Sequence, residues 1–226
     1  MRKMALICVL FFTTMIAPRA LAQPGVDINA DDPQLQWAGL ELQPVITTQV
    51  LILPRLAARA TLQYFGSTAK TNVVYGYFGP SFMPVDWVTI SPMFGLINGW
   101  FEHQTEDATL AAPGLILSLW IECSFAHERL DISAQIDSYF GSNEEQLDLY
   151  AFYRATFHTL PFLNIGLQAE QVNEYVILGP HVGASMSTPD ERVTVAGELQ
   201  YYLWPESGSK RPASHSLRLV LALNVQ

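Results

Sequence analysis

Apolar and polar residues alternate with a period of two along most of the chain, and this pattern predicts β-strands. In residues 147–158, one alternate set reads Leu, Leu, Ala, Tyr, Ala, Phe and the other reads Asp, Tyr, Phe, Arg, Thr, His. Successive side chains of a strand point to opposite faces of the sheet, so the two sets face opposite sides. Most of what the sequence indicates about function depends on which of the two sets faces the inside of the protein.

Ten such segments follow one another from residue 56 to the end of the chain. They are predicted at 56–64, 71–79, 86–100, 114–126, 129–140, 146–159, 162–173, 175–187, 192–204 and 215–226. A further stretch, 45–53, has the composition of a strand but ends at Pro54. Helical patterns between the segments are absent, which excludes βαβ folds, and the short sequential connections favour an antiparallel meander. We therefore predict an all-β, antiparallel up-and-down barrel of about ten strands, formed by residues 45–226.

The N-terminus carries the pattern of a cleaved signal peptide. Two basic residues, Arg2 and Lys3, precede an uncharged apolar run at 5–17, and Ala20-Leu21-Ala22 supplies a small-residue cleavage site. We predict that residues 1–22 are removed during export. Residues 23–44 are rich in Asp, Pro, Gln and Gly, and we expect them to form a flexible periplasmic leader.

The composition of the chain excludes several kinds of binding partner and structure. Hydrophobic residues make up 50% of the 226 residues and charged residues only 15%. Removing residues 1–22 takes three of the 12 basic residues and none of the 21 acidic ones, which leaves a net charge of −12. Such an acidic chain is unsuited to nucleic acid. Only Cys123 then remains, so no intramolecular disulfide forms, and no later apolar run is long enough for a transmembrane helix.

Four features favour a transmembrane barrel whose apolar set faces lipid. Most segments reach the ~9–11 residues that a membrane strand needs. The only lysines after residue 22, Lys70 and Lys210, lie between segments. The longest connections, 101–113 and 205–214, alternate with tight turns, as in a ten-stranded barrel with both chain ends in the periplasm. Aromatic residues gather near segment ends, as membrane interfaces require; the predicted interfacial set is Tyr64, Trp87, Trp100, Phe140, Phe157, Tyr201 and Trp204.

In this pattern of segments, residues 45–226 resemble the small bacterial outer-membrane β-barrel proteins. The resemblance implies a location in the outer membrane of a Gram-negative bacterium, with outer-membrane lipid and the barrel-insertion machinery as partners. Members of that family usually end in an aromatic residue, whereas this chain ends in Leu223-Asn224-Val225-Gln226.

The polar set is then expected to line the lumen. The predicted lumen-lining residues are Arg59, Glu122, Asp131, Asp137, Asp148, Arg154, His158, Glu170, His181, Glu198 and Arg218. Buried charges need partners, so one interpretation is a lattice of ion pairs that fills the lumen. The other is a narrow, cation-preferring pore or a site for a small polar ligand. The expected role is accordingly structural or passive transport in the cell envelope.

Two further functions stay open at this stage. A soluble periplasmic or secreted barrel that binds an apolar ligand shows the same alternation, with the apolar set inside. A membrane-embedded lipid-modifying hydrolase needs a serine, a histidine and an acid in reach of one another. His158 and Asp148 share a face with Thr156, but no serine is fixed beside them, and His215 points away from its neighbours Ser214 and Ser216. No metal-site, cofactor or hydrolase motif occurs, so we predict no enzyme, no metal and no cofactor.

Overall fold

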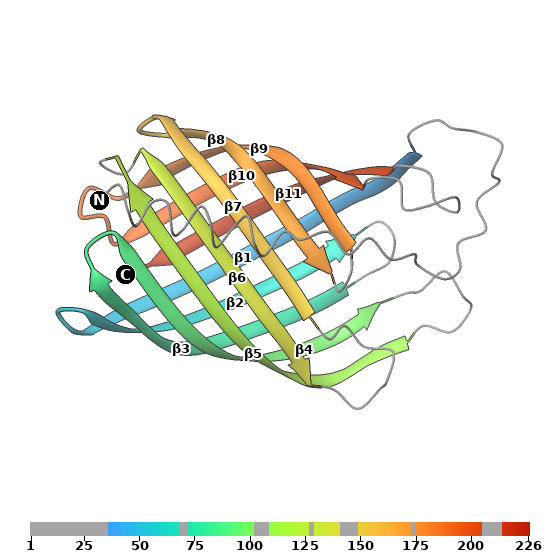
Figure 1. Ribbon diagram of the computed structural model, residues 1–226, viewed down its shortest axis with the longest axis horizontal. Helices are drawn as coiled ribbons and strands as arrows, with labels where there is room; N and C mark the ends of the chain where they lie inside the picture. Colours follow the sequence, from blue (N-terminus) through green and yellow to red (C-terminus); the bar gives the residue numbers. More distant parts are fainter. Residues whose placement is uncertain are drawn as a thin grey trace.

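The alternating segments form strands of one closed sheet in the computed structural model, which describes residues 36–67, 72–101, 109–126, 129–140, 149–172, 175–204 and 214–226 (Figure 1). The strands are β1 (Gln36–Leu53), β2 (Leu56–Ser67), β3 (Asn72–Val85), β4 (Val88–Phe101), β5 (Thr109–Phe125), β6 (Leu130–Phe140), β7 (Leu149–Leu160), β8 (Leu163–Val172), β9 (Tyr175–Ser187), β10 (Val193–Trp204) and β11 (Ser214–Val225). Among these residues no helix is long and apolar enough to cross a membrane. The predicted all-β barrel is confirmed.

The barrel has eleven strands in its described part rather than about ten. Each strand pairs with its neighbours in sequence in antiparallel fashion, and β1 closes the ring against β11. When strand directions alternate around a ring with an odd number of strands, the first and last strands run in the same direction. The β1–β11 pair is therefore parallel, with a register that runs from Gln36↔Ser214 to Thr48↔Val225.

The additional strand is β1, and it corrects the expectation of a flexible leader at 23–44. Residues 36–44 of that segment are strand, continuous with the stretch 45–53. On β1, Glu41 and Gln43 are partly buried while Leu40 and Leu42 are exposed, so the alternation is present here too. The second half of β1, 45–53, has the composition of a strand, but its first half lies in a segment rich in Asp, Pro, Gln and Gly, and its partner, β11, lies at the other end of the chain.

The two ends of the barrel differ in their connections. The turn end carries 54–55, 86–87, 126–129, 161–162 and 188–192, whereas the loop end carries 68–71, 102–108, 141–148, 173–174 and 205–213. The last strand finishes at the turn end, on the left of Figure 1. Because the strand count is odd, the first strand begins at the loop end. The expectation that both ends of the barrel lie on one side is therefore wrong.

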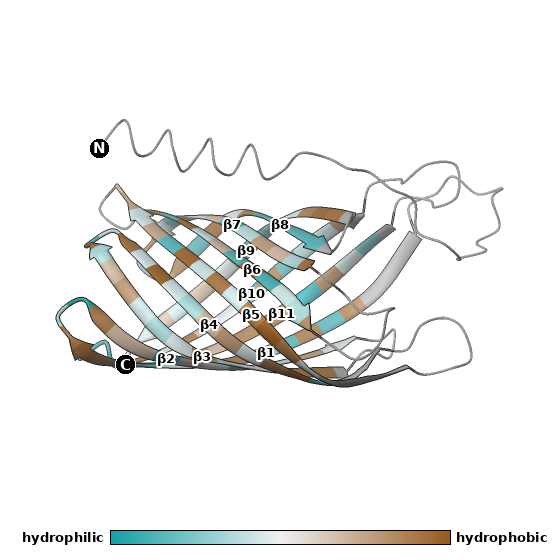
Figure 2. Ribbon diagram, turned by 60° about the horizontal axis from the view of Figure 1, so that its bottom comes forward, coloured by the Kyte–Doolittle hydropathy of each residue, from teal (hydrophilic) through white to brown (hydrophobic). Residues whose placement is uncertain are grey.

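The alternation sorts side chains between the two faces of the barrel wall. Hydrophilic and hydrophobic residues follow one another along the strands (Figure 2). Exposed large apolar side chains occur on every strand, and Phe94, Leu115 and Leu167 are 59%, 61% and 66% exposed. Polar side chains such as Asp137 and Glu170 are buried, with exposed fractions of 0% and 4%. Inside and outside are thus reversed relative to an ordinary water-soluble fold.

One part of the interior is nevertheless apolar. The inward side chains of β3, β4 and β5 form a buried cluster of Val73, Tyr77, Met93, Ile97, Ile116 and Trp120. These strands are apolar on both faces, since outward Phe78 and Phe94 also stack on each other with ring centroids 6.1 Å apart. The barrel interior is therefore packed on the β3–β5 side and polar elsewhere.

The β1–β11 closure predicts a specific cross-link. With Cys8 and Cys123 replaced by serine, the pair Ile46→Cys and Leu223→Cys should form a disulfide on mild oxidation, because the two positions are in register. The control pair, Leu62→Cys with Leu223→Cys, should not: Leu62 lies opposite Ile46 on β2, two strand spacings or about 9–10 Å from β11. A non-reducing gel distinguishes the products. Cross-linking of the control pair alone would indicate a ten-stranded barrel closed by β2 and β11.

Candidate functional site: the barrel lumen

The predicted lumen-lining residues lie on the inward face wherever the structure describes them. Asp148 lies outside the described residues. The other ten occupy inward positions of their strands, and large apolar side chains are exposed at outward positions of every strand. They are not spread evenly, because hydrogen bonds gather them into separate groups.

Arg218 is the centre of the largest group. Its guanidinium donates to Glu170 of β8, to Glu41 of β1 with Nε–Oε2 at 2.6 Å, and to the hydroxyl of Tyr202 on β10 at 2.9 Å. It also lies over the rings of Phe65 and Tyr202, at 5.0 and 4.5 Å from their centroids. Arg218 is buried, so these contacts supply the partners that a charge removed from water requires.

A second chain of contacts extends from this group along β10 to β7. The hydroxyl of Tyr202 donates to Gln200 at 2.9 Å, and Gln200 donates to Glu198 at 2.7 Å. Glu198 pairs with Arg154, whose Nε donates to Thr156 at 2.8 Å. The partner of Arg154 does not lie on a neighbouring strand but on β10, three strands around the barrel from β7.

The remaining charges form smaller groups. Arg59 pairs with Glu122 through two hydrogen bonds of 2.6 and 3.1 Å, and its guanidinium lies 4.6 Å from the ring centroid of Trp120. Asp137 is fully buried and accepts from neutral donors: Tyr77 at 2.8 Å, the Gln135 amide at 2.8 Å, and Ser118. It ties β3, β5 and β6 together beside the apolar cluster.

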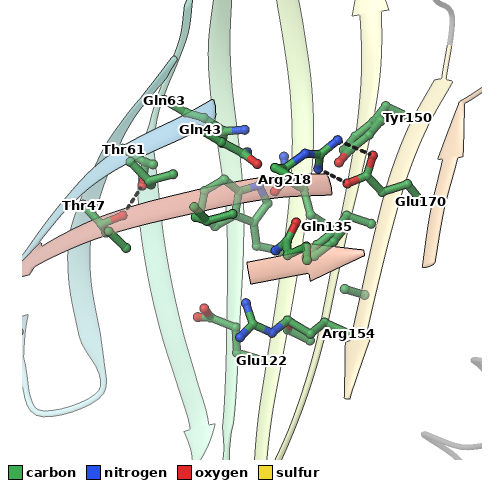
Figure 3. Close-up of a pocket in the computed structure, with 18 of the residues that line it drawn as sticks. Gln43, Thr47, Thr61, Gln63, Glu122, Gln135, Tyr150, Arg154, Glu170 and Arg218 are labelled. Atoms are coloured by element: carbon green, nitrogen blue, oxygen red, sulfur yellow. Dashed lines mark hydrogen bonds and ion pairs between the residues drawn. The ribbon is translucent and has the colours of Figure 1, made fainter. Parts of the chain in front are cut away.

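A cavity of about 240 Å³ lies between these groups. Its charged lining comes from Arg59, Glu122, Arg154, Glu170 and Arg218, all of which the sequence predicted. At about 30 Å³ per molecule, the cavity has room for about eight waters. It is lined by residues of β1, β2, β5, β6, β7, β8, β10 and β11 (Figure 3). The apolar cluster fills the β3–β5 side.

The His158 group has a different arrangement from that of a hydrolase. His158 Nε2 lies 2.6 Å from Asp131 Oδ2, and the hydroxyl of Ser124 donates to Asp131 Oδ1 at 2.7 Å. The carboxylate therefore stands between the serine and the imidazole, whereas a nucleophilic serine must contact the imidazole itself. His215 lies on the outward face, where its Nδ1 is 3.0 Å from the hydroxyl of Tyr201. Among the described residues, no cluster of three or more His, Cys, Asp or Glu side chains is arranged to hold a metal ion.

The predicted interfacial aromatics fall near the two ends of the barrel. Tyr64, Phe140 and Tyr201 lie toward the loop end, and Trp87 and Phe157 lie at the turn end. Trp87 packs against Phe125 with ring centroids 5.3 Å apart. The backbones of Trp100 and Trp204 lie at the loop end, and their side chains are outside the described residues.

Several residues of the site were not predicted. Glu41 was assigned to the leader, and neither Tyr77 nor Tyr202 was chosen as a lumen residue. The polar alternate set of β1 and of β10 was the available signal for Glu41 and Tyr202, whereas β3 is apolar on both faces and gave none for Tyr77. The pairing of Arg218 with Glu41 joins residues 177 positions apart and depends on the parallel closure, which the alternation does not encode.

Comparison with known proteins adds no relative: no protein-family model, curated protein or solved structure matches this chain.

Loss of the central arginine should destabilise the barrel. Arg218→Leu leaves Glu41 and Glu170 buried without their cation, and breaking a buried pair costs about 3–5 kcal/mol. Urea unfolding measures the change. Arg192→Leu is the matched control, because Arg192 lies in an exposed turn, 3.5 Å from Asp190, and its loss should change the free energy of unfolding by less than about 1 kcal/mol. Equal effects of the two substitutions would contradict a structural role for the Arg218 group.

Proposed function

We propose that this chain is an outer-membrane β-barrel protein of a Gram-negative bacterium, whose narrow lumen lets small polar solutes cross the membrane passively. The observation that carries the proposal is the reversal of inside and outside: charged and polar side chains are buried, and large apolar side chains are exposed on every strand. The proposal agrees with the resemblance of the sequence to small bacterial outer-membrane barrels.

The exterior favours lipid over water as the surrounding medium. Monomeric soluble proteins rarely expose contiguous apolar patches larger than a few hundred Å². Here exposed apolar side chains run around the whole ring, including Leu42, Leu62, Phe94, Leu167 and Leu221. Hiding such surface from water is favourable by about 25 cal/mol per Å², and a bilayer does this without a partner protein. A closed barrel also leaves no strand edge unpaired in the hydrocarbon.

The side chains that line the lumen suit water or a polar solute better than an apolar ligand. A carrier of apolar ligands needs a predominantly apolar lining, whereas this cavity has five charged side chains and several amides beside its apolar ones. Buried polar atoms of Asn164, Gln168 and His181 lack a hydrogen-bond partner within the described part of the chain, and such atoms are normally satisfied by water. The arrangement of Ser124, Asp131 and His158 gives no support to a hydrolase.

The amount of free space favours a narrow passage. The apolar cluster of β3–β5 fills one side, and the Arg218 and Arg154 groups connect strands on the other. Barrels of 16–18 strands leave open aqueous channels, but eleven strands enclose far less room. We therefore expect small solutes to cross and larger ones to be excluded.

Detergent dependence tests the membrane location. After expression with its N-terminal segment, the protein should be found in the outer-membrane fraction and enter solution only with detergent. An acidic soluble protein with the same fold would instead be released with the periplasmic contents. Recovery as a detergent-free monomer would overturn the proposal.

A lysine on the outer face should weaken insertion. Leu167 lies midway along β8 and is the residue that we choose for the test. Leu167→Lys should lower stability in lipid vesicles by about 2–4 kcal/mol, the cost of a lysine near the bilayer midplane. The control Glu191→Lys, in the exposed turn before β10, should leave stability nearly unchanged. In a water-soluble barrel, Leu167→Lys would be neutral or would improve solubility.

A further inference from the structure

We infer that the lumen cavity binds and passes a small uncharged polyhydroxylated solute, a polyol or a monosaccharide, in preference to ions. This inference rests on the proposed function and names the solute class that the same cavity selects.

The charges around the cavity are already paired. Arg59 is neutralised by Glu122, Arg154 by Glu198, and Arg218 by Glu170 and Glu41. A charged solute would have to compete for these partners and also lose its own hydration, and both changes are unfavourable. The five charged residues of the lining thus fix the shape of the cavity but offer little to an ion.

Besides Nε of Arg59, which is buried and has no partner within the described part of the chain, the free hydrogen-bonding groups of the lining include the uncharged amides of two glutamines. The side-chain amides of Gln43 on β1 and Gln63 on β2 face the cavity next to each other (Figure 3). No hydrogen bond is formed by either amide within the described part of the chain. Each amide provides two donors and an acceptor, which suits a hydroxyl that both donates and accepts. The two glutamines therefore form the recognition edge of the cavity.

The rest of the lining suits the carbon skeleton of such a solute. Trp120, Tyr150 and Phe152 place aromatic rings on the cavity wall, and Val45 and Val220 add aliphatic surface. Polyols and sugars have C–H faces as well as hydroxyl edges, so a wall with both rings and amides matches both. The volume of about 240 Å³ is below the ~300–1,000 Å³ of pockets for drug-sized ligands, which limits the solute to a few carbon units.

Osmotic swelling of vesicles that contain the full-length protein tests the inference. Glycerol, arabinose and glucose are the neutral probes, sucrose is the size control, and potassium chloride in a planar bilayer reports ions. We expect swelling with the small probes, little with sucrose, and low salt conductance.

Variants of the recognition edge identify the site. The double substitution Gln43→Leu and Gln63→Leu should lower the arabinose swelling rate about fivefold, since two hydrogen bonds are lost. Gln49→Leu is the matched control: Gln49 lies on the same face of β1 but outside the cavity lining, and its rate should equal that of the unchanged protein. Gln63→Asn, which keeps the amide, should retain most of the activity.

The outcomes separate the two proposals. If the protein inserts into vesicles but the neutral probes permeate no faster than through protein-free lipid, the solute inference is wrong and the membrane location stands. High salt conductance, or equal rates for the double variant and the unchanged protein, would also overturn it. If the protein fails to insert at all, the proposed function itself is wrong.

Discussion

Closure of the sheet through the parallel pairing of β1 with β11 is the constraint on which the rest of the structure depends. An open eleven-stranded sheet would expose two edges and could not separate an interior from an exterior. Once the ring is closed, the period-two alternation assigns every side chain to the lumen or to the outer surface. The pairing also places Glu41 beside Arg218, so the β1–β11 backbone pairing and the ion pair between these two residues stabilise the same closure.

The lumen combines two kinds of packing with different consequences. On the side of β3–β5, apolar side chains fill the interior as in an ordinary core. Elsewhere, Arg59, Arg154 and Arg218 connect strands that are not adjacent through acids and tyrosines. Buried charges are costly unless they are paired, so this network holds a fixed geometry. The cavity between the two sides is consequently small and has a defined lining, which favours discrimination between small solutes over an open channel.

The sequence predicted most of the fold because alternation is a local property. It identified β2 to β11 and placed ten of the chosen polar residues on the inward face. It indicated a strand only in the second half of β1, 45–53, and it could not reveal an odd strand count, because parallel closure joins the two ends of the barrel domain. The partners of Arg154 and Arg218 depend on how strands far apart in sequence are positioned along the barrel axis. The alternation within a single strand carries no information about this. The inward apolar cluster escaped notice because β3 and β4 are apolar on both faces.

We propose above all that the apolar face of the barrel wall meets lipid while the polar face meets the lumen. Spin labels placed one at a time along β10, in vesicle-reconstituted protein, test it most directly. At Val195 and Leu199, which face outward, we expect greater collision with dissolved oxygen than with a water-soluble nickel chelate. Labels at Ala196 and Glu198 should show the opposite preference or protection from both. Preferential exposure of Val195 and Leu199 to the nickel chelate would contradict the claim.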